Sequence, residues 1–371
     1  LSIDEGIIMA KIKVMVIDDS ALVRKLMTEL LSSDRDIEVI AQARDPIYAL
    51  EKLKTVKPDV ITLDIEMPRM DGNTFLAKLM AENPIPVVIC SSLAEQGAAT
   101  TLEAIKNGAV DIITKPRVGV KGFLQESSVQ ILEAVKGAAK SRVRKRSKPL
   151  EIKAKNSADV ILPKSQKAMH ETTDKIIAIG ASTGGTQALR ELLSRMPAVS
   201  PGILIVQHMP EKFTTAFAGH LNELSDMDVS EAKKGDRLIP GRVLIAPGGY
   251  HMLLKRSGAF YQVDIIEGPL VSRHKPSVDV LFRSVSRAAG RNAVGCLMTG
   301  MGDDGAQGLL EMKNTGARTF AQDEASSVVF GMPQEAWKKG AAEALVSLDD
   351  IPQTLLDACM GKRFKQSSKR V

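Results

Sequence analysis

The chain has 371 residues, more than one typical core holds, and its hydrophobic content of 44% and charged content of 25% are ordinary for a folded protein. No apolar run is long enough to span a bilayer, no secretory pattern precedes residue 11, and three scattered cysteines form neither a disulfide framework nor a metal-binding spacing. We therefore expect a cytoplasmic protein without membrane insertion.

The net charge of +6 is concentrated in two segments. Residues 140–155 hold eight Lys or Arg and one Glu, and the tail 361–371 holds five basic residues and no acid. The rest of the chain therefore carries a net charge of −6. We expect no nucleic-acid binding by the folded parts, and a nucleic-acid role for the two basic segments stays open as an alternative.

Short apolar segments alternate with amphipathic ones from residue 11 to residue 140. Strands are expected at 13–17, 38–41, 60–63, 87–90 and 111–114, and helices at 22–32, 47–54 and 74–82. This alternation predicts a doubly wound parallel sheet with right-handed crossovers, whose sites lie at the carboxyl ends of the strands. In a sheet of strand order 2-1-3-4-5, the ends that carry polar residues would converge at one edge. Residues 1–10 are interpreted as an N-terminal extension.

Residues 141–173 are basic and polar with little periodicity, so we expect a flexible linker. Alternation returns between 174 and 360, with strands near 176–179, 203–206, 243–246 and 293–298 and a hairpin formed by 252–255 and 260–265. The second half is thus predicted to be another α/β domain, followed by the basic tail 361–371.

Carboxylates and a lysine follow the strands of the first half. Asp18 and Asp19 follow the first strand, Asp64 follows the third, Ser91 ends the fourth and Lys115 follows the fifth. Crowded carboxylates of this kind favour Mg²⁺, beside which a carboxylate can attack a phosphoryl group. Lys115 would supply a further positive charge and Ser91 a hydroxyl donor. The alternative is that residues 18–20 only cap the next helix.

The first half resembles the response-regulator receiver family in three motifs: V-I-D-D-S at 16–20, L-D-I-E-M-P-R-M-D-G at 63–72 and T-K-P at 114–116. The resemblance implies a flavodoxin-like fold, phosphorylation of Asp64 by a histidine kinase, and Mg²⁺ held by Asp18, Asp19, Asp64 and the carbonyl of Glu66. One departure is Ile112, where many receivers have an aromatic residue.

A serine lies in a glycine-rich turn in the second half. The apolar strand 176–179 leads into Gly-Ala-Ser-Thr-Gly at 180–184, and a helix is expected at 187–196. A strand, tight turn and helix expose the Ser182 hydroxyl at the sheet edge. A phosphate-binding turn is the alternative.

A nucleophilic serine needs a base and an orienting carboxylate. His208 follows the strand 203–206, and Asp303 and Asp304 follow the strand 293–298. The other histidines are expected in the linker (His170), on a helix face (His220) and in solvated loops (His251 and His274), with an approach of the last two to a substrate left open.

The second half resembles the chemotaxis protein-glutamate methylesterase family in four motifs: I-G-A-S-T-G-G at 179–185, Q-H-M-P at 207–210, I-A-P-G-G at 245–249 and M-T-G-M-G-D-D-G at 298–305. The resemblance implies a Rossmann-like domain with Ser182 as nucleophile, His208 as general base and acid, and Asp304 as orienting carboxylate. Backbone N–H groups of Thr183 and Met301 would form the oxyanion hole, and hydrolysis would need no cofactor.

Together the resemblances imply an enzyme that removes methyl groups from glutamate esters of methyl-accepting chemotaxis receptors and deamidates receptor glutamines. Its unphosphorylated receiver domain is expected to block the active site, and a chemotaxis histidine kinase to be the phosphodonor. Three alternatives are the same chemistry on another signalling array, a DNA-binding response regulator, and a binding module with a decayed triad.

Overall fold

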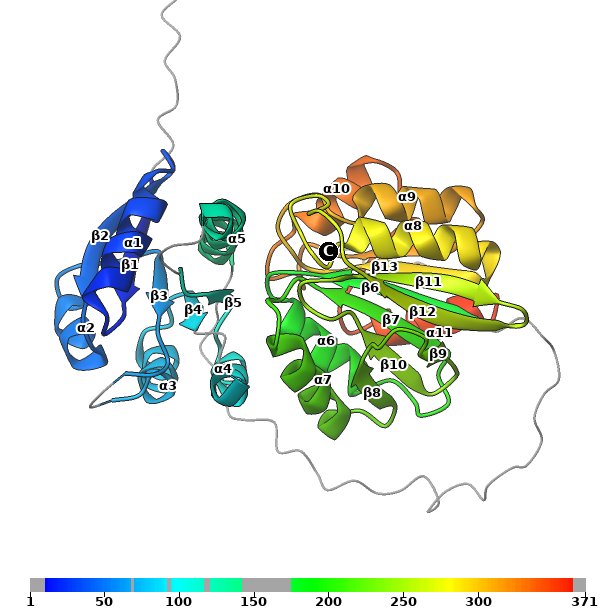
Figure 1. Ribbon diagram of the computed structural model, residues 1–371, viewed down its shortest axis with the longest axis horizontal. Helices are drawn as coiled ribbons and strands as arrows, with labels where there is room; N and C mark the ends of the chain where they lie inside the picture. The colour runs from blue at the N-terminus through cyan, green and yellow to red at the C-terminus, as the bar shows by residue number, and fades with distance from the viewer. Residues whose placement is uncertain (1–10, 68–69, 92–94, 117–120, 142–174, 363–371) are drawn as a thin grey trace, which may run out of the picture.

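The computed structural model describes residues 11–67, 70–91, 95–116, 121–141 and 175–362. The expected extension 1–10, nearly all of the linker 141–173 and most of the tail 361–371 lie outside the described residues. Two α/β units, one from each half of the chain, lie side by side (Figure 1).

The first unit is a five-stranded parallel sheet, as the sequence predicted, and its strand order is β2-β1-β3-β4-β5, the order in which the polar strand ends converge. One face packs against α1 and α5, and the other against α2, α3 and α4. The elements are β1 (Ile12–Ile17), α1 (Ala21–Ser32), β2 (Ile37–Ala43), α2 (Pro46–Lys52), β3 (Val60–Leu63), α3 (Gly72–Glu82), β4 (Val87–Ser91), α4 (Glu95–Lys106), β5 (Asp111–Thr114) and α5 (Lys121–Lys140).

Short polar side chains begin the helices of this unit. The Ser20 hydroxyl accepts from the N–H of Val23 at 3.4 Å and caps α1, and Asp45 caps α2 in the same way. Asp18 does not cap: it accepts from the N–H of Ser20 at 2.9 Å and lies buried beside Lys115. The capping interpretation of residues 18–20 is therefore right only for Ser20.

The second unit is a seven-stranded parallel sheet of order β15-β14-β13-β6-β7-β10-β8. Helices α8, α9 and α10 and the three-stranded sheet β11-β12-β9 pack on one face, and α6, α7 and α11 on the other. The elements are β6 (Ile176–Ala181), α6 (Gly185–Leu193), β7 (Gly202–Gln207), α7 (Phe213–Leu224), β8 (Asp228–Glu231), β9 (Arg237–Leu238), β10 (Arg242–Ile245), β11 (His251–Ser257), β12 (Phe260–Ile266), α8 (Val278–Ala288), the 3₁₀ helix Gly290–Asn292, β13 (Ala293–Leu297), α9 (Ala306–Asn314), β14 (Arg318–Gln322), α10 (Met332–Lys338), β15 (Ala344–Val346) and α11 (Ile351–Cys359).

The strand order reverses at the centre of this second sheet. β6 lies between β7, which follows it in the chain, and β13, which comes much later. The loops after these three strands therefore meet at one carboxyl edge, the place where open α/β sheets bind their ligands. The predicted doubly wound architecture of both halves is confirmed.

The first unit contacts the second through α4 and the start of β5. α4 packs against α6 and α7 (Figure 1). Hydrogen bonds also join the turn after β6 to Asp111, the first residue of β5, and to Val110 directly before it. Among the described helices, none is sufficiently long and apolar to cross a membrane.

Candidate active site

Ser182 lies in the turn after β6, and hydrogen bonds fix its backbone on both sides. The Ser182 N–H donates to the carbonyl of Thr299 at 3.0 Å, and its own carbonyl accepts from Gln207 at 3.0 Å. Gly184 has φ 78°, and a Cβ there would lie 2.4 Å from Val328, so only glycine fits. α6 starts at residue 185, two residues earlier than expected, which makes this turn tight.

Asp304 lies buried in the loop between β13 and α9, against the N-terminus of α8, and receives four hydrogen bonds. His208 Nε2 lies 2.8 Å from it, the Ser277 hydroxyl donates at 2.8 Å, and the N–H groups of Val278 and Asp279 donate at 2.7 and 3.0 Å. Burial alone would raise the pKa of Asp304, but these bonds hold the pKa below its ordinary value. Asp304 is therefore an ionised carboxylate in hydrogen-bond contact with the imidazole.

His208 is left with one nitrogen free. Because Nε2 faces the Asp304 carboxylate, it carries the proton, and Nδ1 has no hydrogen-bond partner among the described residues. Burial, and then the neighbouring His274, lower the pKa of His208 to about 4. No hydrogen bond joins the Ser182 hydroxyl to His208 in the described part of the chain, although both residues line one cavity. The ring is thus neutral and able to accept a proton at Nδ1.

Two backbone amides near Ser182 are available. Neither the N–H of Thr183 nor that of Met301 donates a hydrogen bond within the residues that the structure describes, and both residues line the cavity beside Ser182. Free N–H groups at such a place can stabilise an oxyanion. The next amide, that of Gly184, is occupied: it donates to the carbonyl of Val110 of the first unit at 3.3 Å.

The acidic residues of the first unit converge as the strand order requires. Lys115 Nζ lies 3.0 Å from Asp18 and 2.7 Å from Asp64, both of which are buried. Burial raises the pKa of Asp64 to about 6, against the lowering effect of Lys115. Oxygens of Asp18, Asp19 and Asp64 lie within 4.8 Å of one another, a set of hard ligands that suits Mg²⁺.

Two more residues predicted for this cluster lie at its rim. Glu66 is exposed, and its N–H donates to Asp64 at 3.3 Å. Ser91 is buried at the end of β4 and accepts a hydrogen bond from Thr101 at 3.0 Å. Glu66 thus lies beside Asp64, and Ser91 lies at the end of the neighbouring strand β4.

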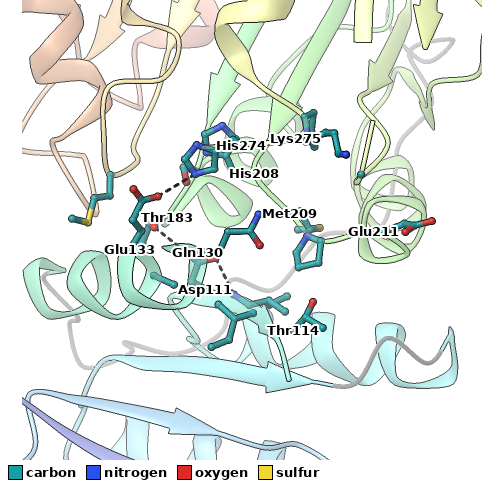
Figure 2. A pocket seen from close by; sticks show the side chains of 18 of the residues that line it. Asp111, Thr114, Gln130, Glu133, Thr183, His208, Met209, Glu211, His274 and Lys275 are labelled. Atoms are coloured by element: carbon teal, nitrogen blue, oxygen red, sulfur yellow. Dashed lines mark hydrogen bonds and ion pairs between the residues drawn. The ribbon is translucent and has the colours of Figure 1, made fainter. Parts of the chain in front are cut away.

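The first unit covers the serine site. Thr183 donates to Asp111 of β5 at 2.8 Å, and Glu133 of α5 pairs with Arg273 at 2.7 Å and with His274 at 3.3 Å. Residues of both units, Ser182 and His208 among them, line a cavity of about 240 Å³. Figure 2 shows His208 there together with Glu133 and Asp111 of the first unit. Access to Ser182 therefore depends on where the first unit lies.

The expectation of solvated loop histidines is wrong for two residues. His251 begins β11, is buried, and bridges the Pro269 carbonyl at 2.9 Å and the Ser277 N–H at 3.3 Å. His274 is buried and stacks on His208. Sequence reasoning missed Asp111 and Glu133 as well, because no motif marks a residue that acts only when two units meet.

Comparisons with known proteins identify the family of each half of the chain. Residues 14–121 match the response regulator receiver domain, and residues 177–355 match the CheB methylesterase family, which leaves no support for a DNA-binding second half. The chain is 57% identical over 350 residues to a Shewanella oneidensis protein named protein-glutamate methylesterase/protein-glutamine glutaminase 3, covering 93% of this chain and 98% of the relative. A Geobacter metallireducens protein of the same name is 57% identical and covers 95% and 100%.

Solved structures are similar to each half separately. The catalytic domain of the Thermotoga maritima CheB methylesterase is 33% identical, with a TM-score of 0.49, and covers 50% of this chain and 98% of that one. The response regulator domain of Thermotoga maritima CheB is 41% identical, with a TM-score of 0.33, and covers 36% and 98%.

Proposed function

Because the chain belongs to the family of protein-glutamate methylesterases/protein-glutamine glutaminases, we propose that it hydrolyses glutamate methyl esters on methyl-accepting chemotaxis receptors and deamidates receptor glutamines. The observation that carries this proposal is the state of His208. Its Nε2 lies 2.8 Å from Asp304, and its Nδ1 has no partner among the described residues, in the cavity it shares with Ser182. An imidazole held in this way is a general base for the serine.

In the first half-reaction the Ser182 oxygen attacks the ester carbonyl and its proton passes to His208 Nδ1. The ionised Asp304 stabilises the resulting imidazolium through Nε2–H. The N–H groups of Thr183 and Met301 hold the oxyanion, each contributing about a hundred-fold or more in turnover. His208 then returns its proton to the methoxide, and methanol leaves.

In the second half-reaction water attacks the acyl-enzyme, with His208 again accepting the proton. The glutamate carboxylate is released and the Ser182 hydroxyl is restored. A glutamine amide passes through the same steps with ammonia as the leaving group, so one site performs both reactions.

We propose that the receiver domain regulates the enzyme and that a chemotaxis histidine kinase phosphorylates it at Asp64. Asp18, Asp19, Asp64 and the Glu66 carbonyl would hold Mg²⁺, which neutralises phosphoryl oxygens when bound. Lys115 and Ser91 would contact the new phosphoryl group. Release of the receiver domain needs only a modest change, since a hundred-fold shift of an equilibrium corresponds to about 2.7 kcal/mol.

Methanol release from methylated receptor membranes, with and without acetyl phosphate, tests this function. Ser182→Ala should lower the rate about a thousand-fold or more, since the nucleophile is lost. Ser194→Ala is the matched control, because Ser194 is exposed at the other end of α6. Methanol release by Ser182→Ala at the wild-type rate would disprove the assignment, and activity only on receptors of another array would replace the substrate.

A further inference from the structure

Two histidine rings stack face to face where the two domains meet. The ring centroids of His208 and His274 are 3.6 Å apart, and the ring planes differ by 6°. His208 belongs to the hydrolytic cluster, whereas His274 lies in the loop before α8 and faces Glu133 of the receiver domain (Figure 2). The charge of His274 therefore acts on His208 at contact distance.

The partners of His274 define its protonation. Its Nδ1 lies 2.7 Å from the carbonyl oxygen of Ser272, and its Nε2 lies 3.3 Å from the carboxylate of Glu133. Both partners can only accept hydrogen bonds, and a neutral imidazole has a single N–H. Only the doubly protonated ring donates to both, so His274 is an imidazolium in this arrangement.

His208 has the opposite requirement. A single N–H, at Nε2, satisfies its contact with Asp304, and Nδ1 is unpaired among the described residues. A proton added to Nδ1 would create a second cation stacked on His274, and like charges at this separation disfavour protonation. The neighbour of the catalytic base thus opposes the step that the base must perform.

We infer that Glu133 holds His274 as an imidazolium against the face of His208, so that the docked receiver domain suppresses proton acceptance by His208 in addition to covering it. The inference rests on the function proposed above and names a mechanism for its regulation. When the receiver domain leaves, Glu133 leaves with it, and a neutral His274 no longer opposes a charge on His208. His274 is then a positioning residue whose charge depends on receiver docking and in turn affects proton acceptance by His208.

The charged groups that face His274 come from several elements. They are Glu133 on α5, Asp111 on β5, His208 and Asp304 in the hydrolytic cluster, and Arg273 in its own loop. Burial alone would lower the pKa of His274, but Glu133 and Asp304 raise it above its ordinary value. Asp304 stays with the catalytic domain, and Asp111 bonds Thr183, so Glu133 is the contact that docking brings to the ring.

Histidine titration by NMR tests this inference in the full-length, unphosphorylated protein, whose five histidines give few signals when labelled with ¹⁵N. Glu133→Gln should lower the titration midpoint of His274 by about one pH unit or more and raise that of His208. Arg273→Gln is the matched control: it removes the other ion pair of Glu133 but leaves the partner of His274, so the His274 midpoint should stay near the wild-type value.

His274→Asn separates this effect from uncovering of the site. The Asn amide can still donate to the Ser272 carbonyl but carries no charge. In that background Glu133→Gln should no longer raise the His208 midpoint, and it should lower it slightly, because the Glu133 carboxylate by itself favours a charge on His208. A rise as large as in the wild-type background, or a His274 midpoint that ignores Glu133→Gln, would overturn the inference. Neither readout needs esterase activity, so the hydrolytic function is judged separately by methanol release.

Discussion

Asp111 of the receiver sheet accepts a hydrogen bond of 2.8 Å from the hydroxyl of Thr183, the residue directly after Ser182. Beside it, the N–H of Gly184 donates to the carbonyl of Val110 at 3.3 Å. The start of the edge strand β5 of one domain thus bonds the turn that carries Ser182 of the other domain. Docking covers this turn and also holds it in place.

Replacing Asp111 should raise the activity of the unphosphorylated enzyme. In Asp111→Ala the docked Thr183 hydroxyl loses its acceptor, which costs about 1–3 kcal/mol, so basal methanol release should rise roughly ten-fold. Asp111→Asn is the control, because it keeps an acceptor oxygen and removes a carboxyl group whose burial raises its pKa to about 6. Its basal rate should not exceed that of the wild type. A low basal rate in Asp111→Ala, with normal activation by acetyl phosphate, would show that this contact does not contribute to inhibition.

Docking should weaken as the pH rises above about 6.5. The pKa of His274 is raised in the docked form, against the lowering effect of burial, chiefly by Glu133. Above its ordinary value of 6.5 the docked form therefore holds a proton that the released form lacks. Basal methanol release should rise with pH more steeply without acetyl phosphate than with it. His274→Asn should abolish the difference between the two profiles.

Asp64→Asn should abolish activation by acetyl phosphate and leave the basal rate unchanged, because the amide cannot form an acyl phosphate. Removal of divalent cations with EDTA should have the same effect on the wild type, since Mg²⁺ serves the receiver domain and not the serine. Asp71→Asn is the control, because Asn can still cap α3. Normal activation of Asp64→Asn would place the phosphorylation site elsewhere.

Gly184→Ala should destabilise the catalytic domain more than Gly235→Ala. Both glycines have positive φ, 78° and 88°, which costs an alanine about 1–2 kcal/mol. Only at Gly184 would the new methyl group also collide with a side chain, 2.4 Å from Val328, whereas nothing lies within 4 Å at Gly235. Thermal unfolding should therefore show a clearly larger fall in Tm for Gly184→Ala. Equal falls would mean that the turn relaxes without strain.

Much of the fold could be predicted because local patterns of apolar and polar residues indicate its strands and helices. β3 and β5 have the predicted bounds, and most other predicted strands differ by one or two residues. Apolar runs of strand length followed by glycines and polar residues also indicate where parallel strands end. That rule placed Ser182, His208 and Asp304 on one edge, where the structure joins His208 to Asp304 at 2.8 Å.

The sequence by itself determined two α/β units and the residues at their carboxyl edges, because strand and helix periodicity and turn glycines act over a few residues. Only the tertiary structure decided that His274 stacks on His208 and that Glu133 reaches it from the other domain. Those contacts depend on which two surfaces pack together and on the burial that follows. No local spacing encodes that choice, so the buried charge beside the base becomes visible only once the domains meet.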